Sequence, residues 1–146
     1  MLMQQLMTDL KTAMKSHDQI RLNTIRLIKS ALMNEKIRLG RELTPDEELT
    51  VLSREKKQRL ESISEFKHGK RPDLVAQSTQ ELALVSAYLP QELSESELTD
   101  LVKKAITVTK ASKKSEFGKV MKVLMPEVKG RADGKMVAKL VQSHLN

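Results

Sequence analysis

The stretch that decides the fold occupies residues 117–134 and reads FGKVMKVLMPEVKGRADG. Its first half predicts a short amphipathic helix, because apolar residues recur on one face at helical spacing while Lys119 and Lys122 fall on the other. Pro126 has no backbone N–H and disfavours helical geometry in the residue before it. The helix is therefore expected to end near Met125.

A tight link and a second helix are expected to follow. Asp133 can cap that second helix by accepting hydrogen bonds from its first free amides. The link itself carries two glycines and the cations Lys129 and Arg131. Cations on both helices and in the link could follow a phosphate backbone, so six residues are the candidate nucleic-acid-binding set: Lys119, Lys122, Lys129, Arg131, Lys135 and Lys139.

The same stretch resembles the signature of the YqeY family, in the run GKVM at 118–121 followed by KGRADG at 129–134. Further segments resemble the family in the same order: GRELT at 40–44, KQR at 57–59, SISEF at 62–66 and YLPQEL at 88–93. The resemblance covers nearly the whole chain. It implies an all-α fold whose small three-helix C-terminal domain is shared with the tail of the GatB subunit of tRNA-dependent amidotransferase. That tail is understood to help hold tRNA, so the resemblance implies an RNA-handling or accessory role more than chemistry.

Two positions depart from the family pattern. Lys110 stands where a glycine is usual, which puts the end of the preceding helix in doubt. Ser78 stands where a glutamate is usual, which removes a carboxylate from a possible surface constellation.

Composition independently favours an all-α protein. Charged residues make up 31% of the 146 residues, and only 5 Gly and 4 Pro are present, too few for a turn-rich β fold. Aromatic residues are 2%, so the core must be aliphatic. The absence of cysteine excludes disulfides, zinc–thiolate sites and a cysteine nucleophile. No apolar run approaches a membrane span, and the N-terminus lacks the apolar core of a signal peptide, so we expect a cytoplasmic protein without a membrane partner.

Seven helices and two domains are expected. Asp18 can cap the second helix, which Gly40 ends, and Thr44 with Glu47 forms a capping box for the third. Pro90 marks the clearest boundary, giving an N-terminal four-helix domain at 1–93 and a C-terminal domain at 94–146. The expected helices cover approximately 1–16, 19–39, 45–68, 72–88, a segment opened by a second capping box at 94–97, 117–125 and 135–145.

The third helix shows a clear division between apolar and charged positions. Its apolar stripe is expected to comprise Leu49, Leu52, Leu60, Ile63 and Phe66. Its solvent-exposed face is expected to consist mostly of charged residues: Lys56, Lys57, Arg59, Glu61 and Glu65.

Charge is spread unevenly along the chain. The net charge is +7, of which residues 94–146 contribute +5 from 11 Lys and Arg against 6 Asp and Glu. A basic surface favours an anionic partner such as tRNA or another structured RNA, and the alternative is a solvated lysine surface. With only three aromatic residues in the chain, any RNA would be held by shape and backbone phosphates rather than by base stacking.

An enzyme would need groups that this sequence does not offer together. The histidines His17, His68 and His144 are isolated, with His144 expected on the inner arc of the last helix. No pair has zinc spacing and no glycine-rich phosphate loop exists, so no catalytic residue, metal or cofactor is expected. Three functions remain open: a non-catalytic tRNA-binding or amidotransferase-associated accessory protein, a carbon–nitrogen ligase using glutamine as amide donor on charged tRNA, and a protein-interaction module using the N-terminal helices. The charge asymmetry favours the first.

Overall fold

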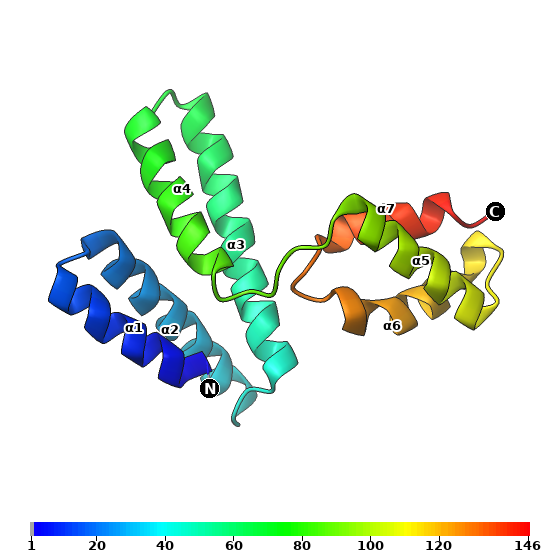
Figure 1. The fold of residues 1–146 in the computed structure, drawn as a ribbon, viewed down its shortest axis with the longest axis horizontal. Coiled ribbons are helices and arrows are strands. Elements are labelled where there is room, and N and C mark those ends of the chain that lie inside the picture. The colour runs from blue at the N-terminus through cyan, green and yellow to red at the C-terminus, as the bar shows by residue number, and fades with distance from the viewer. Residues whose placement is uncertain (1) are drawn as a thin grey trace. The chain divides into compact units, whose positions relative to one another are not determined.

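A computed structural model describes residues 2–146 of the chain, and this range forms seven α-helices and one 3-10 turn with no strand (Figure 1). The prediction of an all-α protein is confirmed. The expected first helix included Met1, which lies outside the described residues. The elements are α1 (Leu2–Ser16), α2 (Gln19–Leu39), α3 (Pro45–His68), α4 (Pro72–Ser86), α5 (Glu95–Thr109), η1 (Lys114–Glu116), α6 (Phe117–Val128) and α7 (Gly134–Ser143).

The helices gather into two compact units. The N-terminal unit extends to Leu89 and contains α1–α4, and the C-terminal unit covers Pro90–Asn146 and contains α5–α7. That each unit folds as a separate domain, divided after residue 93, stays a prediction.

Two antiparallel helix pairs build the N-terminal unit, α1 with α2 and α3 with α4, and α2 also packs against α3 and α4 (Figure 1). As the scarcity of aromatic residues predicts, an aliphatic core fills the space between these helices. Its buried residues are Leu6, Ala13, Ile25, Ile28, Leu32, Val51, Leu52 and Val85.

Local sequence signals set the helix ends in this unit. Asp18 caps α2 by accepting from the backbone N–H of Arg21 at 3.1 Å. Gly40 ends α2 with a φ of +70°, a conformation that costs glycine little. Thr44 and Glu47 exchange hydrogen bonds of 3.2 and 2.9 Å, forming the predicted capping box at the start of α3.

The face of α3 that meets α4 differs from the predicted stripe. Leu60, expected in the apolar stripe, is 48% exposed, whereas Arg59, expected on the solvent-exposed face, is only 7% exposed. Arg59 forms an ion pair with Glu55 one turn earlier, and its Nε lies 3.8 Å from a carboxylate oxygen of Glu81 on α4. The expectation for Arg59 was wrong because α4 packs along α3 and brings Glu81 close to this side chain. Ser78 on α4, which stands where a glutamate is usual in the family, is 5% exposed, so this position does not belong to a surface constellation.

In the C-terminal unit α5, α6 and α7 contact one another in pairs around a second aliphatic core. Every helix contributes at least two side chains to it. The buried residues are Leu98, Val102, Ala105, Ala111, Val120, Leu124, Val128, Val137, Val141 and Leu145.

The prediction that α6 ends near Met125 was wrong, because Pro126 lies inside the helix, which continues to Val128. Proline removes one helical hydrogen bond, but the backbone N–H of Lys129 still donates to the carbonyl of Met125 at 2.9 Å. The continued turn buries Val128, which is 1% exposed. Burying that side chain in the core offsets part of the cost of the proline.

The ends of α5 and α7 combine confirmed and corrected expectations. Ser94 accepts from the backbone N–H of Glu97 at 3.1 Å, so one half of the expected second capping box is present. Lys110 ends α5 with a φ of +57°, the left-handed conformation usually taken by glycine. Asp133 caps α7 as predicted, accepting from the N–H of Lys135 at 3.1 Å. His144 follows the end of α7 and is exposed, so its expected place on the inner arc was wrong.

Candidate nucleic-acid interface

The first two candidate residues lie on the exposed side of α6. This helix turns Val120 and Leu124 into the core, where they are 0% and 1% exposed. Lys119 and Lys122 are both exposed, three positions apart and therefore neighbours on the helix surface. The structure places them as the sequence predicts.

The link after α6 is a tight turn held by backbone hydrogen bonds. The N–H of Arg131 donates to the carbonyl of Val128 at 2.9 Å, and Gly130 adopts a φ of +76°. A residue with a side chain would be strained in that conformation, which explains the glycine. Lys129, just before the turn, is partly exposed.

Arg131 has a structural role that the sequence did not predict. Its Nε donates to the carbonyl of Gln91 at 3.0 Å, and its own carbonyl accepts from the N–H of Leu93 at 2.9 Å. These two bonds tie the link to the first residues of the C-terminal unit. A substitution at Arg131 would thus disturb the fold of this unit as well as any ligand contact.

The last two candidates lie on α7. Val137 and Val141 of this helix are fully buried, whereas Lys135 and Lys139 are exposed and one turn apart. The six predicted residues therefore comprise four exposed lysines on two helices and two partly buried cations in the link between them.

The cations of this unit are not neutralised by carboxylates. Among residues 94–146, all of which the structure describes, no two side chains form an ion pair, although 11 are basic and 6 acidic. Two of the acidic side chains bind backbone N–H groups instead: Glu116 accepts from Ser112 at 2.7 Å, and Asp133 caps α7. The positive charge of the unit is consequently free to act on an external anion.

The N-terminal unit behaves differently, because within the described residues six of its seven arginines, all except Arg26, form ion pairs with its carboxylates. A hydrogen bond from Arg38 lowers the pKa of Glu35, and one from Arg71 lowers the pKa of Asp73. Arg41 likewise binds Glu47 with N···O distances of 2.7 and 2.9 Å. The contrast marks the C-terminal unit as the more attractive surface for an anion.

Five further exposed cations of the C-terminal unit were not included in the predicted set. The basic excess of residues 94–146 could have identified them, because they contribute to its net charge of +5. They are Lys103 and Lys104 on α5, Lys110 at its end, and Lys113 and Lys114 before α6.

The three histidines of the chain lie far apart in the sequence. His17, His68 and His144 are all exposed. Within residues 2–146 no group of three or more His, Asp and Glu side chains could hold a metal ion. In the same range no helix has the length and apolar character needed to cross a membrane.

Three curated relatives share most of the length of this chain. A protein of Pyrenophora tritici-repentis is 36% identical over 141 residues, covering 94% of this chain and 77% of its own length. A protein of Saccharomyces cerevisiae is 34% identical over 132 residues, covering 87% and 68%. A protein of Candida glabrata is 33% identical over 122 residues, covering 82% and 66%.

All three relatives are named "Altered inheritance of mitochondria protein 41, mitochondrial". This name contradicts the cytoplasmic location expected from the sequence. The expectation rested on the lack of a membrane span and of the apolar core of a signal peptide, and neither feature distinguishes the cytoplasm from the aqueous interior of an organelle. These two features were therefore the wrong basis for choosing a compartment.

A family description independently covers the same length. The family described as Yqey-like protein matches residues 3–145, which includes every helix of both units except the first residue of α1. The resemblance noted in the stretch at 117–134 thus extends across the chain, and the protein belongs to the YqeY-like family.

Proposed function

We propose that this protein is a non-catalytic accessory protein that binds tRNA or another structured RNA through the C-terminal unit. The observation that carries the proposal is the unpaired charge of that unit, +5 over residues 94–146 with no internal ion pair. Unpaired surface cations attract phosphate without first having to break a salt bridge.

Phosphate contact is the binding mode that these side chains support. The exposed lysines of α6 and α7 are flexible point charges, suited to phosphates along a backbone. Phe117 is the one aromatic residue of this unit, and its partial burial against the core leaves no platform for base stacking. Recognition would thus depend on the shape and charge of a folded RNA. The resemblance of KGRADG at 129–134 to the tail of GatB favours tRNA among such molecules and suggests an association with amidotransferase.

The test measures binding of the full chain to fluorescently labelled tRNA by anisotropy over a range of salt concentrations. The variant Lys119→Glu/Lys122→Glu leaves the link intact and reverses two exposed charges. It should weaken binding and reduce the slope of log K against log salt by about two, since each lost phosphate contact removes about one counterion.

A matched control is available in the N-terminal unit. Lys57 and Lys67 are exposed on α3, so Lys57→Glu/Lys67→Glu changes the net charge equally at a different surface. This control should bind nearly as tightly as the parent chain. Equal losses in both variants would show that only net charge matters, and affinity that does not respond to salt would refute the proposal.

A further inference from the structure

Exposed methionines and cations share one face of the α1–α2 pair, which belongs to the N-terminal unit, whereas the residues of the RNA proposal belong to the C-terminal unit. The methionines Met7, Met14 and Met33 are 41%, 52% and 46% exposed. Positions 7, 11 and 14 share one side of α1, and positions 26, 29 and 33 share one side of α2, by helical spacing. We call this set the methionine face: Met7, Lys11 and Met14 of α1 with Arg26, Lys29 and Met33 of α2.

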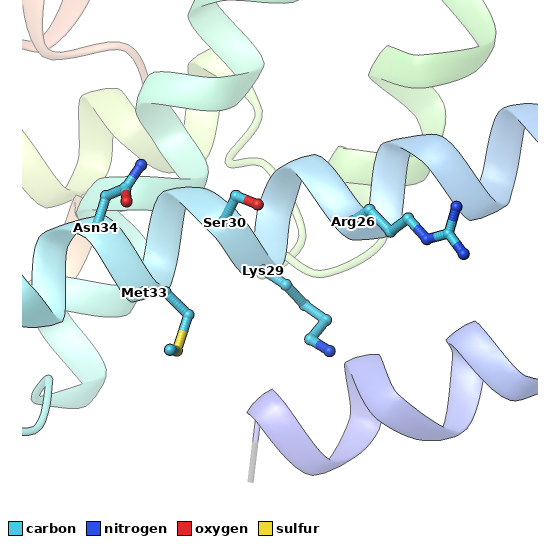
Figure 2. A pocket seen from close by; sticks show the side chains of 5 residues that line it. All are labelled: Arg26, Lys29, Ser30, Met33 and Asn34. Carbon is cyan, nitrogen blue, oxygen red and sulfur yellow. The ribbon is translucent and has the colours of Figure 1, made fainter.

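One contact shows that the two rows of the methionine face are adjacent. The Nζ of Lys29 on α2 lies 3.1 Å from the sulfur of Met7 on α1. The α2 row also borders an open hollow of about 400 Å³ lined by Arg26, Lys29, Ser30, Met33 and Asn34. Figure 2 shows Lys29 and Met33 extending to the same side of α2, while Ser30 and Asn34 lie along its other edge.

No free carboxylate neutralises this face, because those of α1 and α2 are engaged elsewhere. Asp9 accepts a hydrogen bond from the hydroxyl of Tyr88, and Asp18 caps α2. Glu35 is held by Arg38 and is only 13% exposed. Lys11, Arg26 and Lys29 form no ion pair within the described residues.

We propose that the methionine face is a docking surface for an acidic amphipathic helix of a partner protein. Methionine side chains are unbranched and polarizable, so they adapt to the apolar side chains of a partner helix. The flanking cations of Lys11, Arg26 and Lys29 match carboxylates at the rim of such a helix and select against a basic one. In helix-in-groove recognition the apolar face of a helix packs against an apolar surface, and complementary charge around it adds specificity.

The chemistry of the face favours a protein helix over the other anionic partners. A lipid-binding face usually carries Trp, Phe or Leu to enter the membrane interface, whereas the six residues of the methionine face include none of these. An RNA-binding face has no use for three exposed methionines, since they neither stack on bases nor bind phosphate. The inference is independent of the proposed RNA binding, which uses the other unit.

The methionine methyl groups provide a direct assay on the full chain. The chain contains 8 methionines, and their ¹³C-labelled methyl signals can be assigned by single Met→Leu substitutions. The probe is a synthetic 18-residue peptide with Leu at helical i, i+3, i+4 and i+7 spacing and Glu at the remaining positions. The matched probe replaces every Glu with Lys.

Titration with the acidic peptide should shift the signals of Met7, Met14 and Met33 and leave Met121 and Met125, which pack against the other core, unchanged. The basic peptide should cause no shift. The variant Arg26→Glu/Lys29→Glu should weaken binding of the acidic peptide about tenfold, because like charges then meet at the rim. Lys57→Glu/Lys67→Glu, with the same change in net charge, should bind as the parent chain does.

Three results would overturn the proposal. The first is no shift at millimolar acidic peptide, and the second is an equal response to both peptides. The third is a response of Met7, Met14 and Met33 to phosphatidylglycerol vesicles or to tRNA but not to the acidic peptide, which would assign the face to a lipid or an RNA. Retention of the Tyr88 emission of the folded chain confirms that each variant is folded.

Discussion

Replacing Arg59 with methionine tests the role of a charge buried between two helices. The guanidinium group pairs with Glu55 on its own helix and lies 3.8 Å from Glu81 on α4, while its side chain is only 9% exposed. Methionine has a similar length but no charge. Arg59→Met therefore keeps most of the packing and leaves the two carboxylates without their partner.

The structure sets the expected size of the effect. Two unit charges 3.8 Å apart interact by about 4 kcal/mol at an effective dielectric constant of 20. The side chains of Glu55 and Glu81 are 12% and 20% exposed, so water can restore part of this loss. We expect Arg59→Met to lower the free energy of unfolding by about 3 kcal/mol, near the lower end of the range for breaking a buried pair.

Arg54 on the same helix provides a matched control. Its guanidinium also lies 3.8 Å from a carboxylate, that of Glu35, but its side chain is 54% exposed. Because exposed ion pairs contribute little, Arg54→Met should leave the urea midpoint nearly unchanged. The two variants thus compare a buried and an exposed arginine, each 3.8 Å from a carboxylate on another helix, and the buried one also pairs with Glu55.

Urea unfolding followed by tyrosine emission is the suitable assay. The chain has one tyrosine and no tryptophan, so the emission reports on Tyr88 alone. Tyr88 belongs to the N-terminal unit, and burial together with its hydrogen bond to Asp9 raises its pKa. If Arg59→Met destabilises the unit no more than Arg54→Met does, burial of the Arg59 ion pair does not stabilise the contact between α3 and α4, and the reasoning fails.

Three further predictions concern helix structure and can be checked by denaturation monitored with circular dichroism. Pro126→Ala restores a helical N–H donor inside α6 and should stabilise the C-terminal unit by about 2 kcal/mol; a neutral result would mean that the proline costs nothing there. Lys110→Gly relieves a left-handed backbone and should stabilise by about 0.5–1 kcal/mol, whereas Lys110→Ala should not. Hydrogen bonds from Arg41 and, to a lesser extent, from the backbone N–H of Thr44 lower the pKa of Glu47 from 4.5 to about 2. The ionised Glu47 side chain therefore stabilises the folded chain fully above pH 4.5, and this contribution is lost as the pH falls toward 2. Glu47→Gln should flatten the pH dependence of stability in that window, and an unchanged acid titration would contradict this.

The arrangement of the candidate interface could be predicted only in part. Sequence spacing correctly placed Lys119, Lys122, Lys135 and Lys139 on exposed helix faces, because the opposite faces carry the apolar residues that must be buried. It could not show that Arg131 holds the link against the carbonyl of Gln91, since those residues are forty positions apart.

The sequence by itself determined the helical fold class, most helix ends and the basic excess of residues 94–146. Helix ends are decided within three or four residues, as at Thr44 and Asp133, so a local pattern is sufficient to predict them. The tertiary structure alone decided that Arg59 is buried and that α6 continues past Pro126. Both outcomes depend on which helix packs against a given face. Val128 is buried by, and Arg59 is covered by, segments distant in the sequence. The free energy gained from such packing exceeds the local helix propensity that opposes it.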